Sequence, residues 1–276
     1  MARFSRMSLV GFAGLLAACA MAPVASAGEY STANSLGFSR DGNTFVFEEY
    51  GSTDGLGAPY VNLFAIDIAR DKWLKGTPVR LQSSEEEVMA QEEKLADAGI
   101  TDPFDMEEHT KDAIDALRAK AAQQAQPVLN SLGKLYAADL RVHNPPHELT
   151  SDARNVRFSV PGYRSLINNP PEILAWGLTL EETFFPAGES CFALHDKMAG
   201  FTLTLTNEQT GEKIVLNDDK RVPKSRGCPL KYYVEQVLVF PRKDNGFSLA
   251  VLVRYAKPGF EGPDGRLIAV TGLVDR

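Results

Sequence analysis

The sequence lacks the catalytic motifs that are most easily recognised by their spacing. It contains no G-x-S-x-G nucleophile turn, no H-E-x-x-H pair, no Walker loop and no G-x-G-x-x-G loop. Gly55 and Gly57 come closest to a phosphate loop, but they lie between two predicted strands, where no helix N-terminus follows to hold a phosphate. These absences argue against a nucleotide-dependent enzyme.

The sequence also has fewer basic than acidic residues. The chain has 29 lysines and arginines against 36 aspartates and glutamates, which gives a net charge of −7. Because phosphate contacts need clustered basic side chains, we expect no nucleic-acid partner. The sequence has no basic stripe that would bind anionic lipid.

Long apolar runs are absent except near the N-terminus, so no transmembrane span is expected. Arg3 and Arg6 precede an apolar run over residues 9–24, and the small residues 25–27 end just before Gly28. This order is typical of a cleaved export signal covering residues 1–27. It predicts a periplasmic or secreted protein in which residues 28–276 form a single domain.

A lipoprotein signal is the alternative interpretation of the same segment. Residues 16–19 read LAAC, a pattern in which the cysteine, here Cys19, becomes the lipidated first residue. Residues 20–27 would then tether a membrane-anchored protein to the bilayer. Both interpretations place the mature protein outside the cytoplasm.

Cysteine is scarce as well. Only Cys191 and Cys228 follow the predicted signal, and an exported chain meets oxidising conditions, so we expect a disulfide between them. A loop of this length gives about 4 kcal/mol of stabilisation in the chain-entropy treatment. The alternative is a reactive thiol helped by His195, but no C-x-x-C motif supports it.

The residues that are present predict a mainly β fold built of antiparallel meanders, either blade-like or sandwich-like. Breaker-rich turns separate β-branched and aromatic runs at residues 44–50, 60–67, 72–74, 135–142, 155–160, 201–206, 213–216, 232–240, 247–255 and 266–273. The last three runs are apolar at both odd and even positions, which indicates a sheet covered on both faces.

A helical insertion is predicted at about residues 83–133. Ser84 followed by three glutamates is a capped helix start, and Gly99 is a stop. A second helix begins near Thr101 or Asp102, and Pro127 is expected to kink or end it. Its polar face is typical of a solvated surface, with a partner-binding helix as the alternative.

No metal or other cofactor is expected from the spacing of the possible ligands. His143 and His147 flank Asn-Pro-Pro, which favours an extended path that holds the two rings about 12 Å apart. Seven aspartates are the candidate calcium ligands, and none falls in an EF-hand pattern. They are Asp41, Asp54, Asp67, Asp71, Asp218, Asp219 and Asp264.

The loop at residues 51–60 is the best candidate for a recognition surface. It is long, rich in glycine and bordered by Tyr50 and Tyr60, with Asp54 at its centre. A flexible connection between two structural tyrosines is the competing interpretation. The glycine- and proline-rich stretch at residues 258–265 is ambiguous in the same way.

Several short sequence motifs resemble those of known families. Residues 37–42 (GFSRDG) with LFAID at 63–67 resemble one blade of a TolB-like propeller. The same GFSRDG phrase, continued through FEEYG at 47–51, together with RGCP at 226–229 and GFEGPD at 259–264, resembles the predicted secreted bacterial proteins of domain of unknown function 2259. That second resemblance implies export and the cysteine pair, and it implies no activity.

The sequence therefore favours a non-catalytic binding or envelope-associated module, whose partner would be an envelope protein or a glycan. An extracytoplasmic hydrolase that uses Asp and Glu is the alternative. An open pocket with converging carboxylates would favour the hydrolase, whereas surface loops on a filled core would favour the binding module.

Overall fold

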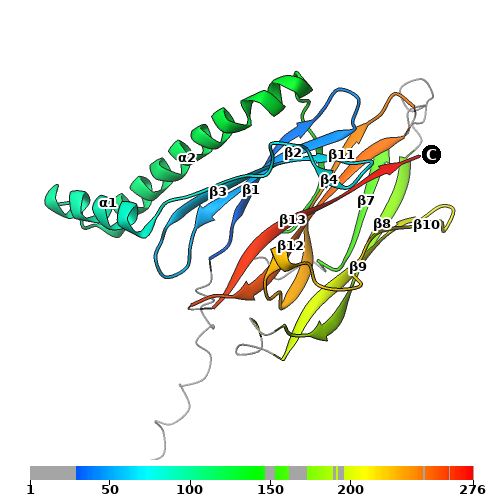
Figure 1. Ribbon diagram of the computed structural model, residues 1–276. Helices are drawn as coiled ribbons and strands as arrows, with labels where there is room; N and C mark the ends of the chain where they lie inside the picture. The colour runs from blue at the N-terminus through cyan, green and yellow to red at the C-terminus, as the bar shows by residue number, and fades with distance from the viewer. Residues whose placement is uncertain are drawn as a thin grey trace, which may run out of the picture.

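The computed structural model describes residues 29–146, 153–161, 173–188, 191, 196–244, 246–260 and 262–275. These residues form three antiparallel sheets and two helices (Figure 1). The predicted mainly β fold with a helical insertion is thereby confirmed. The predicted signal and Cys19 lie outside the described residues.

The N-terminal sheet contains β1 (Thr32–Phe38), β2 (Thr44–Ser52), β3 (Pro59–Asp67), β4 (Lys72–Trp73) and β5 (Val79–Gln82). Its strands follow the order β1-β2-β3-β4, and β5 also pairs with β3. The first turn forms as its residues predict, because Asp41 accepts bonds from the Ser39 hydroxyl at 2.6 Å and the Asn43 amide at 3.1 Å. Gly42 supplies the positive φ of 74° that this turn needs.

Helices α1 (Glu85–Asp97) and α2 (Pro103–Leu132) follow this sheet. Ser84 caps α1 in a complete capping box with Glu87, as the sequence indicates. Ala121 and Ala125 of α2 pack on Val46 and Leu63 of the sheet. Pro127 is expected to kink or end this helix, and the end does not occur: α2 continues to Leu132, because its packing on the N-terminal sheet offsets the cost of the proline.

The central sheet has the order β13-β12-β11-β6, with β6 (Asp139–His143), β11 (Lys231–Pro241), β12 (Phe247–Pro258) and β13 (Pro263–Val274). Ten consecutive residues of β12 are buried. The apolar character at both odd and even positions is explained, because this sheet is covered on both faces.

The outer sheet has the order β10-β9-β8-β7, with β7 (Asn155–Pro161), β8 (Ile173–Pro186), β9 (Lys197–Asn207) and β10 (Lys213–Asp218). Strand β8 was not predicted from the sequence. Its signal was present, because Trp176, Leu178 and Leu180 alternate with more exposed residues and point into the core.

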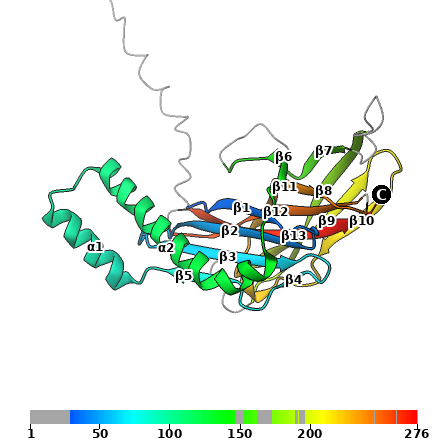
Figure 2. The same cartoon turned by 90° about the horizontal axis from the view of Figure 1, so that it is seen from above.

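The elements stack as layers: α2, the N-terminal sheet, the central sheet and the outer sheet (Figures 1 and 2). One apolar core lies between each pair of neighbouring layers. The sheets pack face to face, so the arrangement is sandwich-like. The N-terminal meander has the strand order of a blade, but the resemblance to a TolB-like propeller is not confirmed.

A disulfide joins Cys191 to Cys228, as predicted. Cys228 follows a short 3-10 helix, η2 (Lys224–Arg226), and the bond ties this segment to the chain just beyond β8. The predicted partner of the alternative reactive thiol, His195, lies outside the described residues.

Candidate functional site

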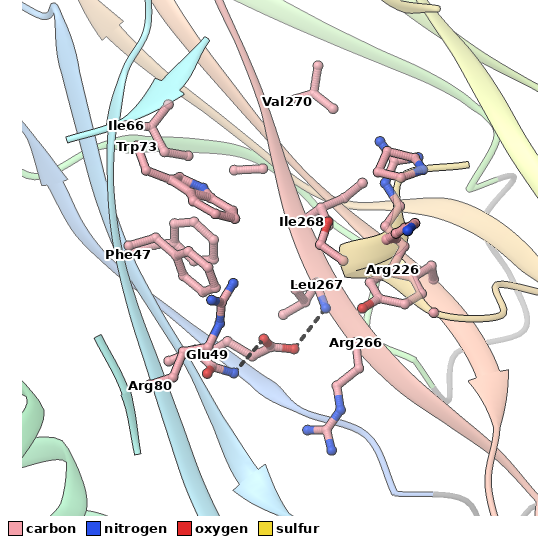
Figure 3. Close-up of a pocket in the computed structure, with 18 of the residues that line it drawn as sticks. Phe47, Glu49, Ile66, Trp73, Arg80, Arg226, Arg266, Leu267, Ile268 and Val270 are labelled. Carbon is pink, nitrogen blue, oxygen red and sulfur yellow. Dashed lines mark hydrogen bonds between the residues drawn. The ribbon is translucent and has the colours of Figure 1, made fainter. Parts of the chain in front are cut away.

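An open cleft lies between the N-terminal sheet and β13, with η2 at its far wall. It has a volume of about 950 Å³. Figure 3 shows Phe47, Trp73 and Arg80 on the side of the N-terminal sheet, with Arg226 on the other side of β13. These residues are up to 179 positions apart in the sequence, so only the fold brings them together.

Strand alternation decides which side chains line the cleft. Successive residues of a strand point to opposite faces, so Tyr60, Asn62, Phe64 and Ile66 of β3 all face the central sheet. The residues between them, such as Val61 and Leu63, pack on the other face against α2.

The cleft stays open because β13 is the last strand of the central sheet on this side. No strand of the structure's described portion pairs with its outer edge beyond the short contact at Gly265. Gly265 and Leu267 direct their N–H groups away from β12, to the Glu29 carbonyl and the Glu49 carboxylate. The same alternation directs the N–H of Ala269, two residues on, toward the cleft.

Glu49 is the buried carboxylate of this site, with 3% of its surface exposed. One of its oxygens accepts a bond from the Leu267 amide at 2.8 Å, and the other accepts from the Asn62 side chain at 3.2 Å (Figure 3). Glu49 therefore joins the N-terminal sheet to the edge of the central sheet, and both of its oxygens are used.

Two arginines from opposite sheets approach the cleft over aromatic rings. The guanidinium of Arg80, on β5, lies 5.2 Å from the ring centre of Trp73 and 6.0 Å from that of Phe64. Arg266, on β13, lies 3.8 Å from the ring centre of Tyr60. Burial lowers the pKa of Arg266, and the charges of Glu49 and Glu29 oppose that shift.

Arg226 of η2 forms the far wall. It binds Asp219 at 2.5 Å and donates to the Tyr232 hydroxyl at 3.3 Å. Burial raises the pKa of Tyr232 to about 12, so this hydroxyl stays protonated at neutral pH. Burial also raises the pKa of Asp71, which lines the same cleft, and the charge of Arg226 opposes that shift.

The three residues predicted to mark a recognition loop point to different places. Tyr50 faces α2, where the guanidinium of Arg118 lies 4.4 Å from its ring centre. Asp54 accepts a bond from the backbone amide of Phe260, in the other glycine-rich turn. Tyr60 alone of the three lines the cleft.

The fold brings together the two glycine-rich loops at residues 51–60 and 258–265, a contact that the sequence does not predict. Gly55 lies against the ring of Phe260, and that ring is 83% exposed. The role of the loop at residues 51–60 as a recognition surface stays a prediction.

The possible metal ligands are scattered. Within the described ranges, no three His, Cys, Asp or Glu side chains are grouped so that they could hold an ion. His143 lies at the exposed end of β6, and His147 lies outside the described residues. Among the aspartates, Asp41 and Asp67 form turns, Asp218 and Asp219 pair with Lys220 and Arg226, and Asp264 pairs with Lys257.

Four residues of the cleft were not predicted as site residues: Arg80, Trp73, Arg226 and Arg266. Each is a single basic or aromatic residue in a strand or short turn, and the residues around it form no recognisable binding motif. Arg226 lies in the RGCP motif, which supports the family resemblance and contains Cys228 but is not a known binding motif.

The chain belongs to the family described as "Predicted secreted protein (DUF2259)", whose model matches residues 46–272. The stated resemblance to this family is confirmed. Neither a curated protein nor a solved structure gives a significant match. Across the described ranges, no helix has both the length and the apolar character needed to cross a membrane.

Proposed function

We propose that this member of the family is an exported, non-catalytic binding module that takes its ligand in the cleft between the N-terminal sheet and β13. The observation that carries the proposal is the open cleft itself, whose volume of about 950 Å³ falls in the range of ligand sites. Its walls combine aromatic rings with charged and amide side chains, the mixture by which such sites orient a ligand.

Binding is favoured over hydrolysis by the state of the carboxylates. Glu49 and Asp71 are the two carboxylates among the described residues of the cleft wall. Both oxygens of Glu49 already accept structural hydrogen bonds, so Glu49 is poorly suited to act as a second acid, base or nucleophile. Asp71 alone does not provide the carboxyl pair that glycoside hydrolysis generally uses.

Trp73 makes ligand binding measurable without a label. The chain has two tryptophans; Trp73 is 49% exposed at the cleft and Trp176 is 2% exposed in the core. Acrylamide therefore quenches mainly Trp73. We expect a fraction of a bacterial envelope extract to protect Trp73 from quenching in the wild-type protein. The protection should be much weaker in Ser225→Phe, because a bulky ring on η2 narrows the cleft.

A loop deletion separates the cleft from the alternative recognition surface. Removing residues 53–57 takes away the Asp54–Phe260 and Thr53–Ala58 bonds and no residue of the cleft wall. Protection of Trp73 that persists in this variant supports the cleft. Protection that is lost there and kept in Ser225→Phe would move recognition to the loop, and an extract with no protecting fraction would refute the binding function.

The mature protein is proposed to be periplasmic, released by cleavage after Ala27, and to bind an envelope protein or glycan. The motive is the order of basic, apolar and small residues in the first 27 positions. Intact-mass measurement of the mature protein should give an N-terminus at Gly28. A diacyl-modified Cys19 would establish the lipoprotein instead, and a chain that begins at Met1 would contradict both.

A further inference from the structure

The cleft is positively charged inside an acidic protein. Its walls bear six cationic side chains against the two carboxylates of Glu49 and Asp71, although the whole chain has a net charge of −7. The cationic residues are Lys72, Arg80, Lys224, Arg226, Lys257 and Arg266.

Four of these six cations form no ion pair with the described residues. Arg226 pairs with Asp219 at 2.5 Å, and Lys257 lies 3.5 Å from Asp264. For the other four, no carboxylate of the described chain lies within ion-pair distance, although the charges of Glu49 and Glu29 act on Arg266 from farther away. An anionic ligand would supply the missing charge, and the fork geometry of arginine suits a carboxylate.

The rest of the wall indicates a ligand that also carries many hydroxyl groups. Asn62, Gln82, Asn217 and Ser225 bring amide and hydroxyl groups to the cleft, and the N–H of Ala269 adds a backbone donor. Trp73 adds a half-exposed ring on which the apolar face of a sugar can lie. Carboxylates, hydroxyls and flat apolar faces occur together in uronic-acid sugars.

We propose that the ligand of the cleft is an acidic oligosaccharide of uronic-acid units, an inference that rests on the proposed binding function. Arg80 and Arg266 bind its carboxylates from the two opposite walls, and the side-chain amides bind its hydroxyls. The net charge of −7 on the whole chain disfavours a broad polyanion such as a nucleic acid, because the cations are gathered in the cleft while the chain as a whole is acidic.

The test compares uronate oligomers with the same oligomers after methyl esterification, which removes the charge and keeps the sugar skeleton. Hexamers of galacturonate, mannuronate and glucuronate are titrated by calorimetry and by acrylamide quenching of Trp73. We expect at least one acid to bind roughly tenfold or more tightly than its ester, because charge-assisted bonds are lost in the ester. Added salt should reduce the difference.

Arg80→Gln together with Arg266→Gln should remove the preference for the acid over the ester. Arg157→Gln is the matched control, because Arg157 lies on the outer sheet, pairs with Glu208 and is 83% exposed. Equal binding of acid and ester, or a preference that survives the double substitution, would overturn the role of charge. If no hexamer binds, the saccharide class is wrong, whereas protection of Trp73 by another envelope fraction would leave the binding function standing.

Discussion

Replacing Arg254 by methionine should destabilise the protein by about 3–5 kcal/mol, the range seen when one partner of a buried ion pair is removed. Arg254 is 1% exposed in the middle of β12 and pairs with Glu235 of β11, which is 3% exposed. The substitution leaves the Glu235 carboxylate buried without its counter-charge, and this uncompensated charge accounts for most of the loss.

Arg254 also anchors the start of the described chain. It donates to the Ser31 carbonyl at 2.7 Å and to the Gly265 carbonyl at 3.2 Å, so it holds the segment before β1 against β13. We therefore expect hydrogen exchange at Ser31, whose amide bonds the Gly265 carbonyl, to accelerate in the variant.

Urea denaturation measures the first effect, with Arg157→Met as an exposed control that should change stability by less than about 0.5–1 kcal/mol. The double variant Arg254→Met with Glu235→Leu should recover part of the loss, because it removes both charges. If Arg254→Met has the same urea midpoint of unfolding as the wild-type protein, the Glu235 carboxylate must be neutralised or solvated in the variant without Arg254.

Local pattern was enough to predict most strands, both helices and the disulfide. The alternation that places Tyr60 in the cleft and Tyr50 against α2 follows from strand geometry, once the strands are known. Of the kink or end predicted at Pro127, the end does not occur, because packing of Ala121, Ala125 and Val128 on the N-terminal sheet outweighs the local cost of proline.

The cleft could not be predicted from the spacing of residues in the sequence, because it forms only where the N-terminal sheet meets the edge of the central sheet. Arg80 and Arg266 are 186 positions apart, and neither has a neighbour in sequence that suggests a ligand. The register that pairs β3 with β5 and leaves β13 at an edge places them on opposite walls of one cavity. That register depends on long-range packing, which a local pattern does not contain.

The second large effect is expected from removing the disulfide. Replacing Cys191 and Cys228 together by serine opens a loop of 37 residues and should lower stability by about 4 kcal/mol in the chain-entropy treatment. Residual structure in the unfolded chain would make the measured loss smaller. Urea denaturation of the oxidised wild-type protein and of the double variant gives the value, and thiol titration of the unfolded wild-type protein should find no free thiol.

This substitution should also affect the cleft, because Cys228 lies two residues after Arg226 at the end of η2. Arg226 bonds to Asp219 and Tyr232 independently of the disulfide, so in the double variant η2 should remain attached but less firmly held. We therefore expect weaker binding of the uronate hexamer even under conditions where the variant is fully folded. Unchanged affinity in the folded variant would mean that Arg226 alone positions η2, and two reactive thiols in the wild-type protein would refute the bond.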